Sequence, residues 1–233
     1  MNNTFVIASS KPWNSKLPER LQFLTGHNFQ LINYQEDLTV ENLAKIDPRF
    51  VFFPHWSYRI PDDVFQSFEC VIFHMTDLPF GRGGSPLQNL IARGIYETKI
   101  SALRCVEVLD AGPIYLKRPL SLYGSGEEIY IRASNIVEDM IVEIVRDNPK
   151  PLDQVGEPTF FKRRRPDQGK LEATQTLDQA FDLIRMLDAE GYPHAFIDIG
   201  NFRLEFTRAN RRSDRIVADV SITLVDQKNS TSN

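Results

Sequence analysis

The chain has 233 residues, of which 42% are hydrophobic and 25% are charged. This length suits one sizeable domain, or one main domain with a small appendage. The formal net charge of -4 weighs against broad nucleic-acid binding, because phosphate contacts need a basic face. No apolar run approaches the roughly 18 residues of a membrane span, and the start lacks the basic and apolar regions of a signal peptide. We therefore expect a cytoplasmic protein with no membrane partner.

The first part of the chain alternates short apolar runs with polar stretches. Four runs of strand length, rich in Val, Ile and Phe, lie at residues 5–9, 29–34, 49–54 and 70–75. This alternation is typical of βαβ units with both faces of the sheet covered. The sequence therefore predicts an α/β fold with a Rossmann-like, mostly parallel sheet and flanking helices.

The middle of the chain mixes helical and strand patterns. Ser125 and Glu128 form a capping-box pattern, and apolar residues then repeat at helical spacing. The expected elements, in chain order, are a helix at 85–94, a strand at 99–109, an antiparallel continuation at 113–122 and a long helix at 125–148.

A change in composition follows the long helix. Residues 147–158 contain three prolines and no amphipathic pattern, which indicates a linker or an extended crossover. A helix is expected from Thr176, capped by Gln179, to Gly191, and antiparallel strands with a tight turn at Gly200-Asn201 follow it. The expected organisation is a catalytic domain at 1–155, a small C-terminal α+β domain at 156–225 and a disordered tail at 226–233.

The stretch CVIFHMTDLPFGRGGSPLQNLI, residues 70–91, begins as a strand and ends as a helix, with His74 at the end of the strand. From His74 to Ile114 the chain resembles the formyltransferases that use 10-formyltetrahydrofolate, and most of all the sugar-nucleotide N-formyltransferases. Their pattern is N-x-H-x-S-x-L-P, then R-G, A-P-x-Q and L-D-x-G. The matching positions are His74, Thr76, Pro79, Arg82-Gly83, Pro86, Gln88 and Leu109-Asp110-Ala111-Gly112.

The resemblance implies roles for particular residues. His74 would polarise the formyl oxygen and Asp110 would serve in proton transfer. The formyl donor would be 10-formyltetrahydrofolate, bound by residues in and around the motif: Thr76, Leu78, Pro79, Arg82, Gly83 and Leu109. Candidate acceptor-binding residues are His55, Trp56, Arg163 and Arg164. For Trp56 core packing is an equal alternative. For the two arginines the alternative is a solvated surface, which is the usual place for such a cluster.

The positions of His74 and Asp110 also point to a shared site without the family pattern. His74 ends one predicted strand and Asp110 ends the strand after the next helix. Sites in open α/β sheets gather at the carboxyl ends of strands, so the two side chains are expected in one crevice. The alternatives are a structural histidine and a turn aspartate. No histidine or cysteine spacing suggests a metal site, and Cys70 and Cys105 read as buried free thiols.

One position departs from the family pattern. Two residues before the histidine the family has an asparagine that donates to the oxygen of the tetrahedral intermediate, and here that residue is Ile72. Asn89 on the following helix is a candidate substitute. The departure keeps open a non-catalytic protein that binds folate or a nucleotide.

The acceptor is expected to be a small amine, namely an amino sugar nucleotide of surface-glycan biosynthesis. The acidic charge and the short C-terminal part favour it, and they argue against a nucleic-acid partner. A methionyl-tRNA formyltransferase-like activity is the alternative, and a homodimer stays open.

Overall fold

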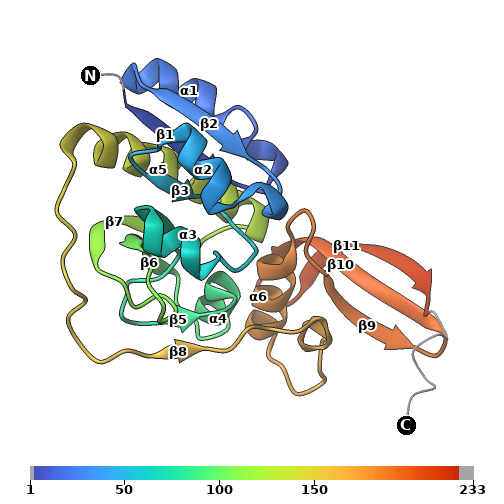
Figure 1. Cartoon of the computed structure of the whole chain (residues 1–233). Helices are drawn as coiled ribbons and strands as arrows, with labels where there is room; N and C mark the ends of the chain where they lie inside the picture. The colour runs from blue at the N-terminus through green and yellow to red at the C-terminus, as the bar shows by residue number, and fades with distance from the viewer. Residues whose placement is uncertain (1–2, 226–233) are drawn as a thin grey trace, which may run out of the picture. The chain divides into compact units, whose positions relative to one another are not determined.

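The computed structural model describes residues 3–225 and forms two compact units that alternate along the chain (Figure 1). The first unit contains the residues up to 86, then 97–120 and 132–161. The second contains 87–96, 121–131 and, among the described residues, 162–225. The domain boundary expected at residue 155 stays a prediction, and the tail expected at 226–233 lies outside the described residues.

The first unit is built around a six-stranded sheet with the order β2-β1-β3-β4-β6-β7. β1, β2, β3 and β4 are parallel to their neighbours, whereas β6 runs antiparallel to β4. The mostly parallel sheet is therefore confirmed. Its strands are β1 Thr4–Ala8, β2 Asn28–Ile32, β3 Val51–Phe53, β4 Cys70–His74, β6 Glu97–Arg104 and β7 Ile114–Ser121.

Helices cover both faces of this sheet (Figure 1). Leu43 of α2 and Val64 of α3 belong to one buried cluster with Val6 and Val51 of the strands. On the opposite side, α1 is tied to α5 by Arg20, whose Nε donates to Glu138 at 2.9 Å. The helices are α1 Leu17–Thr25, α2 Val40–Ile46, α3 Asp62–Ser67 and α5 Gly126–Asp147, with short 3-10 turns η1 Pro12–Asn14 and η2 Gln35–Asp37.

A two-stranded parallel sheet joins the loop after β4 to the segment that follows α5. It consists of β5 Arg82–Gly83 and β8 Phe160–Phe161. Residues 148–159 contain no helix or strand, as their prolines predict, apart from a single bridge between Leu152 and Ile114. This extended segment therefore acts as a strap along the first unit.

The second unit pairs a helix with an antiparallel sheet of order β11-β10-β9. Both predicted capping boxes form, at Ser125 with Glu128 and at Thr176 with Gln179. α6 ends at Leu187, earlier than the expected stop, and Gly191 lies in the turn beyond it with a φ of 75°. The elements are α4 Pro86–Ile91, η3 Pro166–Gly169, α6 Leu177–Leu187, β9 Ala195–Ile199, β10 Phe202–Arg211 and β11 Ile216–Leu224.

Both cysteines are free thiols. Burial raises the pKa of Cys105 to about 11 and raises the pKa of Cys70 further, so neither is a thiolate at neutral pH. Among residues 3–225, none of the helices is long and apolar enough to cross a bilayer.

Candidate active site

The carboxyl ends of β3 and β4 bring two predicted site residues to the same edge of the sheet. Phe53 and Ile72 are paired in the parallel register. His55 and His74 each lie two residues further along, so they follow neighbouring strand ends. The carboxyl edge of a parallel sheet is where ligands bind in α/β folds.

His74 is buried, with 8% of its surface exposed, and its ring is held on both sides. Nε2 lies 2.8 Å from the carbonyl oxygen of Gly81, and Nδ1 lies 3.6 Å from Oδ2 of Asp110. A carbonyl oxygen only accepts hydrogen bonds, so the geometry places a proton on Nε2. The two residues that the sequence pairs are thus neighbours, with Asp110 also buried.

Asp110 reaches His74 by a route that differs from the expected one. β6 ends at Arg104 rather than near Asp110, and because β6 is antiparallel to β4 this end lies beside Val71, at the start of β4. The chain then doubles back through residues 105–109. The expectation that Asp110 ends a strand is therefore wrong, although the two residues do converge.

Two backbone features make this reversal fit. Asp110 has a φ of 53°, in the left-handed region that aspartate tolerates better than most residues. Gly112 runs so close to β6 that a Cβ there would lie 1.8 Å from the Arg104 carbonyl oxygen. Any side chain at residue 112 would push the Asp110 loop away from the sheet.

The glycine-rich loop after β4 packs against the strap and against β8. Gly83 has a φ of 106°, and a Cβ there would lie 2.4 Å from the Phe161 carbonyl oxygen. Its amide donates to Oδ2 of Asp110 at 2.8 Å. The amide of Gly81 donates to the Thr159 hydroxyl at 2.7 Å. The loop therefore holds both Asp110 and the carbonyl that faces His74.

Gln154 is a supporting residue that the sequence did not reveal. Its amide nitrogen donates to the carbonyl oxygens of Asp110 and Gly112, at 2.8 and 2.9 Å. Its side-chain oxygen accepts two hydrogen bonds from the guanidinium of Arg82. Gln154 thus joins both halves of the family pattern, but it lies in a proline-rich stretch with no local signal.

The segment between His74 and the glycine loop is held in place by side chains of β6 and β7. Ser101 on β6 donates to the Thr76 carbonyl oxygen at 2.7 Å, and Lys117 on β7 binds Asp77 and the Leu78 carbonyl. Burial alone would raise the pKa of Asp77, but Lys117 and Lys99 outweigh it and lower the pKa. These contacts fix the backbone that carries Thr76, Leu78 and Pro79.

The residues expected to bind the donor differ in how they can do so. Thr76 and Leu78 are fully buried, whereas Leu109 is 67% exposed. Pro79 follows a cis peptide bond, and Arg82 is half-buried and held by Gln154. Their binding role stays a prediction.

The missing family asparagine has no replacement at Asn89. The Asn89 amide nitrogen donates to the Lys162 carbonyl at 2.9 Å, and its oxygen accepts from Arg93. Ile72 itself is half-buried and packs against the apolar cluster of α2 and α3. Because side chains alternate along a strand, Ile72 shares the face of His74.

The residues expected to bind the acceptor lie in different units. His55 has a φ of 55°, and burial together with the charge of Lys11 lowers its pKa to about 4. Trp56 packs on Phe53 and Tyr58, yet its indole N–H has no hydrogen-bond partner among the described residues. Arg163 and the half-buried Arg164 belong to the second unit.

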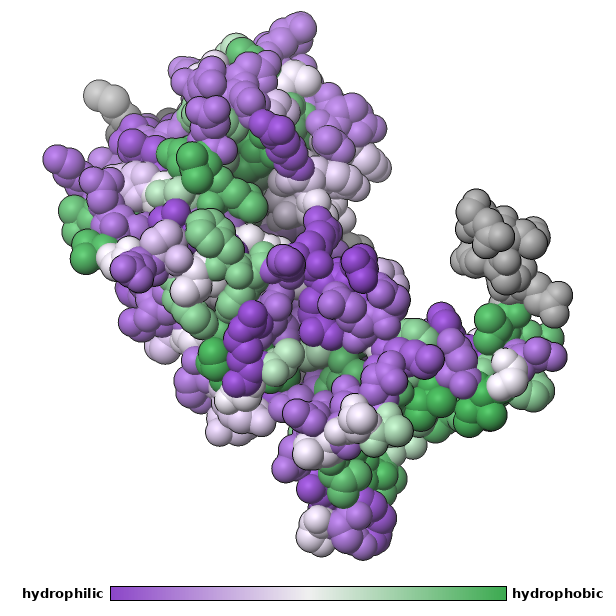
Figure 2. All heavy atoms as spheres, turned by 90° about the horizontal axis from the view of Figure 1, so that it is seen from below, coloured by the Kyte–Doolittle hydropathy of each residue, from purple (hydrophilic) through white to green (hydrophobic). Residues whose placement is uncertain are grey.

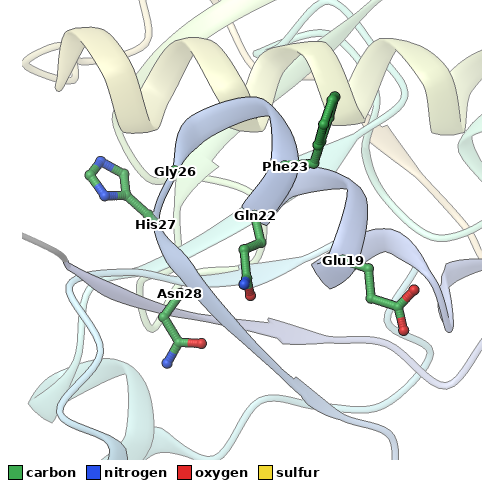
Figure 3. A pocket seen from close by; sticks show the side chains of 6 residues that line it. All are labelled: Glu19, Gln22, Phe23, Gly26, His27 and Asn28. Carbon is green, nitrogen blue, oxygen red and sulfur yellow. The ribbon is translucent and has the colours of Figure 1, made fainter.

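A surface hollow of about 460 Å³ lies elsewhere, between α1 and the start of β2 (Figure 3). It contains none of the predicted site residues and is lined by Glu19, Gln22, Phe23, Gly26, His27 and Asn28. Residues 3–225 hold no group of three His, Cys, Asp or Glu side chains that could bind a metal ion.

Comparison with known proteins identifies the family. A solved structure described as methionyl-tRNA formyltransferase from Clostridium thermocellum is 48% identical, with a TM-score of 0.93, and the match covers 96% of this chain and 100% of that one. The chain belongs to the formyltransferase family. The model "Methionyl-tRNA formyltransferase, C-terminal domain" also matches residues 166–223.

More distant formyltransferases are also similar to the chain, in sequence or in fold. Methionyl-tRNA formyltransferase of Thermodesulfovibrio yellowstonii is 24% identical over 159 residues, which are 65% of this chain and 52% of that protein. A sugar N-formyltransferase from Shewanella is 16% identical, with a TM-score of 0.66 and 96% of both chains covered. The chain spans about half the length of the curated relatives it matches. These comparisons favour the tRNA alternative over the amino-sugar expectation.

Proposed function

We propose that this formyltransferase moves a formyl group from 10-formyltetrahydrofolate to the amino group of methionyl-tRNA. The observation that carries the proposed chemistry is the buried contact between His74 and Asp110 at the edge of the sheet. The choice of acceptor is supported by the 48% identity to a protein described as a methionyl-tRNA formyltransferase.

Formyl transfer to nitrogen makes three demands on a site. The amine must lie close to the formyl carbon, the oxygen that becomes negative must meet a fixed donor, and a proton must leave the attacking nitrogen. His74 and Asp110 are suited to the last two demands. Nε2 of His74 would donate to the formyl oxygen, which replaces the Gly81 carbonyl as its partner.

Asp110 would have two parts in this scheme. It would keep the ring of His74 oriented through Nδ1, and it would accept the proton that the amine loses. That proton would then pass to the folate nitrogen as its bond to the formyl carbon breaks, which gives tetrahydrofolate. The Gly83 amide already holds Oδ2 of Asp110 at 2.8 Å, so the carboxylate needs little reorganisation. The folate would lie along the glycine loop, where Arg82 and the exposed Leu109 offer a charge and an apolar surface.

Substitution of the pair tests the proposed chemistry. Replacing His74→Ala or Asp110→Asn should each lower turnover by about a hundredfold or more, the scale of lost acid–base catalysis. The measurement is release of tetrahydrofolate in the presence of the acceptor. Thermal unfolding and folate binding should stay close to those of the wild type.

His27→Ala provides a matched control. His27 precedes β2 and so lies at the amino edge of the sheet, away from the strand ends that carry His74. Its loss should leave turnover unchanged. Normal turnover in His74→Ala would remove His74 from the mechanism.

An amino sugar nucleotide remains a second candidate acceptor. The net charge of -4 favours a small acceptor, because a polyanion such as tRNA needs a basic face. Incubation with 10-formyltetrahydrofolate and either charged initiator tRNA or a panel of amino sugar nucleotides separates the two. Folate binding without release in any mixture would instead support the non-catalytic alternative.

A further inference from the structure

The strap after α5 is open to solvent along most of its length. Between residues 152 and 159 every residue is exposed except Gln154, which is half-buried. The apolar side chains of Leu152 and Val155 are 70% and 89% exposed. In Figure 2, which views the molecule from the side where β8 lies in Figure 1, green hydrophobic spheres are open to solvent beside purple ones. Burial of these side chains therefore contributes little to holding the strap in place.

Backbone hydrogen bonds fix the strap on both sides of Gln154. Leu152 and Ile114 exchange two of them, at 2.7 and 2.9 Å. Further along, the Thr159 carbonyl accepts from the Arg82 amide at 2.9 Å. Gln154 is thus delivered to a fixed place between the start of β7 and the glycine-rich loop.

The side-chain amide of Gln154 has a full set of partners. Its nitrogen donates to the carbonyls of Asp110 and Gly112, and its oxygen accepts from Nε and Nη2 of Arg82. A carbonyl only accepts and a guanidinium only donates, so these partners fix the direction of the amide. Glutamate would supply the acceptor without the donor. The position therefore requires both halves of an amide.

The two carbonyls that Gln154 holds lie on either side of Ala111, in the turn that carries Asp110. Asp110 has a φ of 53°, and a residue with a Cβ stays in this left-handed region only where its surroundings hold it there. The Gly83 amide holds the carboxylate of Asp110, whereas Gln154 holds the backbone of the turn. Together the two contacts fix both ends of the Asp110 residue.

We propose that Gln154 is a positioning residue for formyl transfer. It holds the turn so that the Asp110 carboxylate faces Nδ1 of His74, and it gives Arg82 an acceptor beside the glycine-rich loop. Gln154 contacts no reacting atom, and without it the carboxylate spends less time in the orientation that proton transfer requires. This inference rests on the proposed function, because it needs Asp110 as the group that accepts the proton.

The variant Gln154→Glu separates the two contacts. A carboxylate still accepts from Arg82, but it cannot donate to the carbonyls of Asp110 and Gly112. The kcat should fall by about tenfold or more, whereas the KM for 10-formyltetrahydrofolate should stay within about twofold of the wild type. Release of tetrahydrofolate in the presence of charged initiator tRNA measures both constants.

Gln175→Glu is the matched control. Gln175 is also half-buried, but it lies in the second unit, and its side-chain oxygen accepts from the Glu172 amide. A glutamate keeps this hydrogen bond and adds the same negative charge as Gln154→Glu. Both kcat and KM should therefore equal those of the wild type.

A double variant shows whether Gln154 acts through Asp110. In the background of Asp110→Asn, Gln154→Glu should change the remaining kcat by less than about twofold, because the group that it positions is already lost. A variant that merely unfolds more easily would lose kcat by the same factor in both backgrounds, and its thermal unfolding midpoint would fall.

Two results would overturn the role of Gln154. One is a wild-type kcat in Gln154→Glu, and the other is an equal loss of kcat with and without Asp110→Asn. Normal turnover in Asp110→Asn alone would instead contradict the proposed function, so the two failures are distinguishable.

Discussion

The imidazole of His74 meets an oxygen on each side, and this is the central feature of the site. Gly81 supplies a carbonyl to Nε2, and Asp110 supplies a carboxylate near Nδ1. Both are hydrogen-bond acceptors, and the carbonyl makes Nε2 the donor of this contact. Ile72 stands where the family has an asparagine, so we expect His74 to donate the hydrogen bond that stabilises the developing oxyanion.

At a neighbouring strand end, His55 is expected to make stability depend on pH. Burial and Lys11 lower its pKa to about 4 in the folded chain, from 6.5 when unfolded. The unfolded state therefore binds more protons between these values, and stability should fall as pH drops from about 6.5 to about 4. Urea unfolding midpoints at pH 7 and pH 5 measure this.

The variant His55→Asn isolates that contribution. Asparagine tolerates the φ of 55° at this position and does not titrate. The loss of stability between pH 7 and pH 5 should be smaller than in the wild type. An equal loss in both proteins would mean that another group is responsible.

Among the elements, α6 contains a buried ion pair that supports the second unit. Arg185 is 4% exposed, and its Nε donates to Asp182 at 2.7 Å. Its Nη1 also donates to the carbonyls of Leu122 and Gly124, so one side chain ties α6 to the segment before α5. The second unit is thus held together by a polar contact as well as by its apolar helix face.

Removal of one partner of this pair should be costly. Arg185→Met leaves the Asp182 carboxylate buried beside Tyr96, and loss of one partner of a buried ion pair costs about 3 to 5 kcal/mol. Urea unfolding should show this loss. The double variant Arg185→Met with Asp182→Leu should recover part of it, because no uncompensated charge remains.

An exposed pair provides the comparison. Arg146 and Asp147 form an ion pair at the end of α5 that is open to solvent. Arg146→Met should leave the unfolding midpoint unchanged. If Arg185→Met were equally harmless, the pair would have no structural role.

For the whole molecule, the distribution of charge bears on the acceptor. The chain is acidic overall, yet Lys162, Arg163, Arg164 and Arg165 are consecutive in the second unit. Burial, with the nearby charge of Arg93, lowers the pKa of Arg164, as expected where cations gather. A local basic cluster suffices for phosphate contacts even when the net charge is negative.

Salt dependence tests this cluster as a tRNA contact. If the acceptor is tRNA, its affinity should fall steeply with salt, and Arg163→Ala should lower the slope of log K against log salt by about one. Arg215→Ala is the control, because Arg215 is paired with Asp214 in the turn between β10 and β11. Equal slopes for Arg163→Ala and the wild type would place the tRNA elsewhere.

Local chemistry explains what the sequence alone determined. The four apolar runs became β1 to β4, the capping boxes formed at Ser125 and Thr176, and the turn formed at Gly200-Asn201. The family pattern likewise singled out His74 and Asp110. Each of these signals depends on residues that are close in sequence, so their spacing predicts the local structure directly.

Tertiary structure decided what depends on distant residues. The antiparallel direction of β6, the return of the chain to Asp110 and the support from Gln154 have no local signal. Each follows from how segments far apart in sequence pair across the sheet. The identity of a residue does not determine which distant residue its backbone will hydrogen-bond. Only the folded chain therefore shows these pairings.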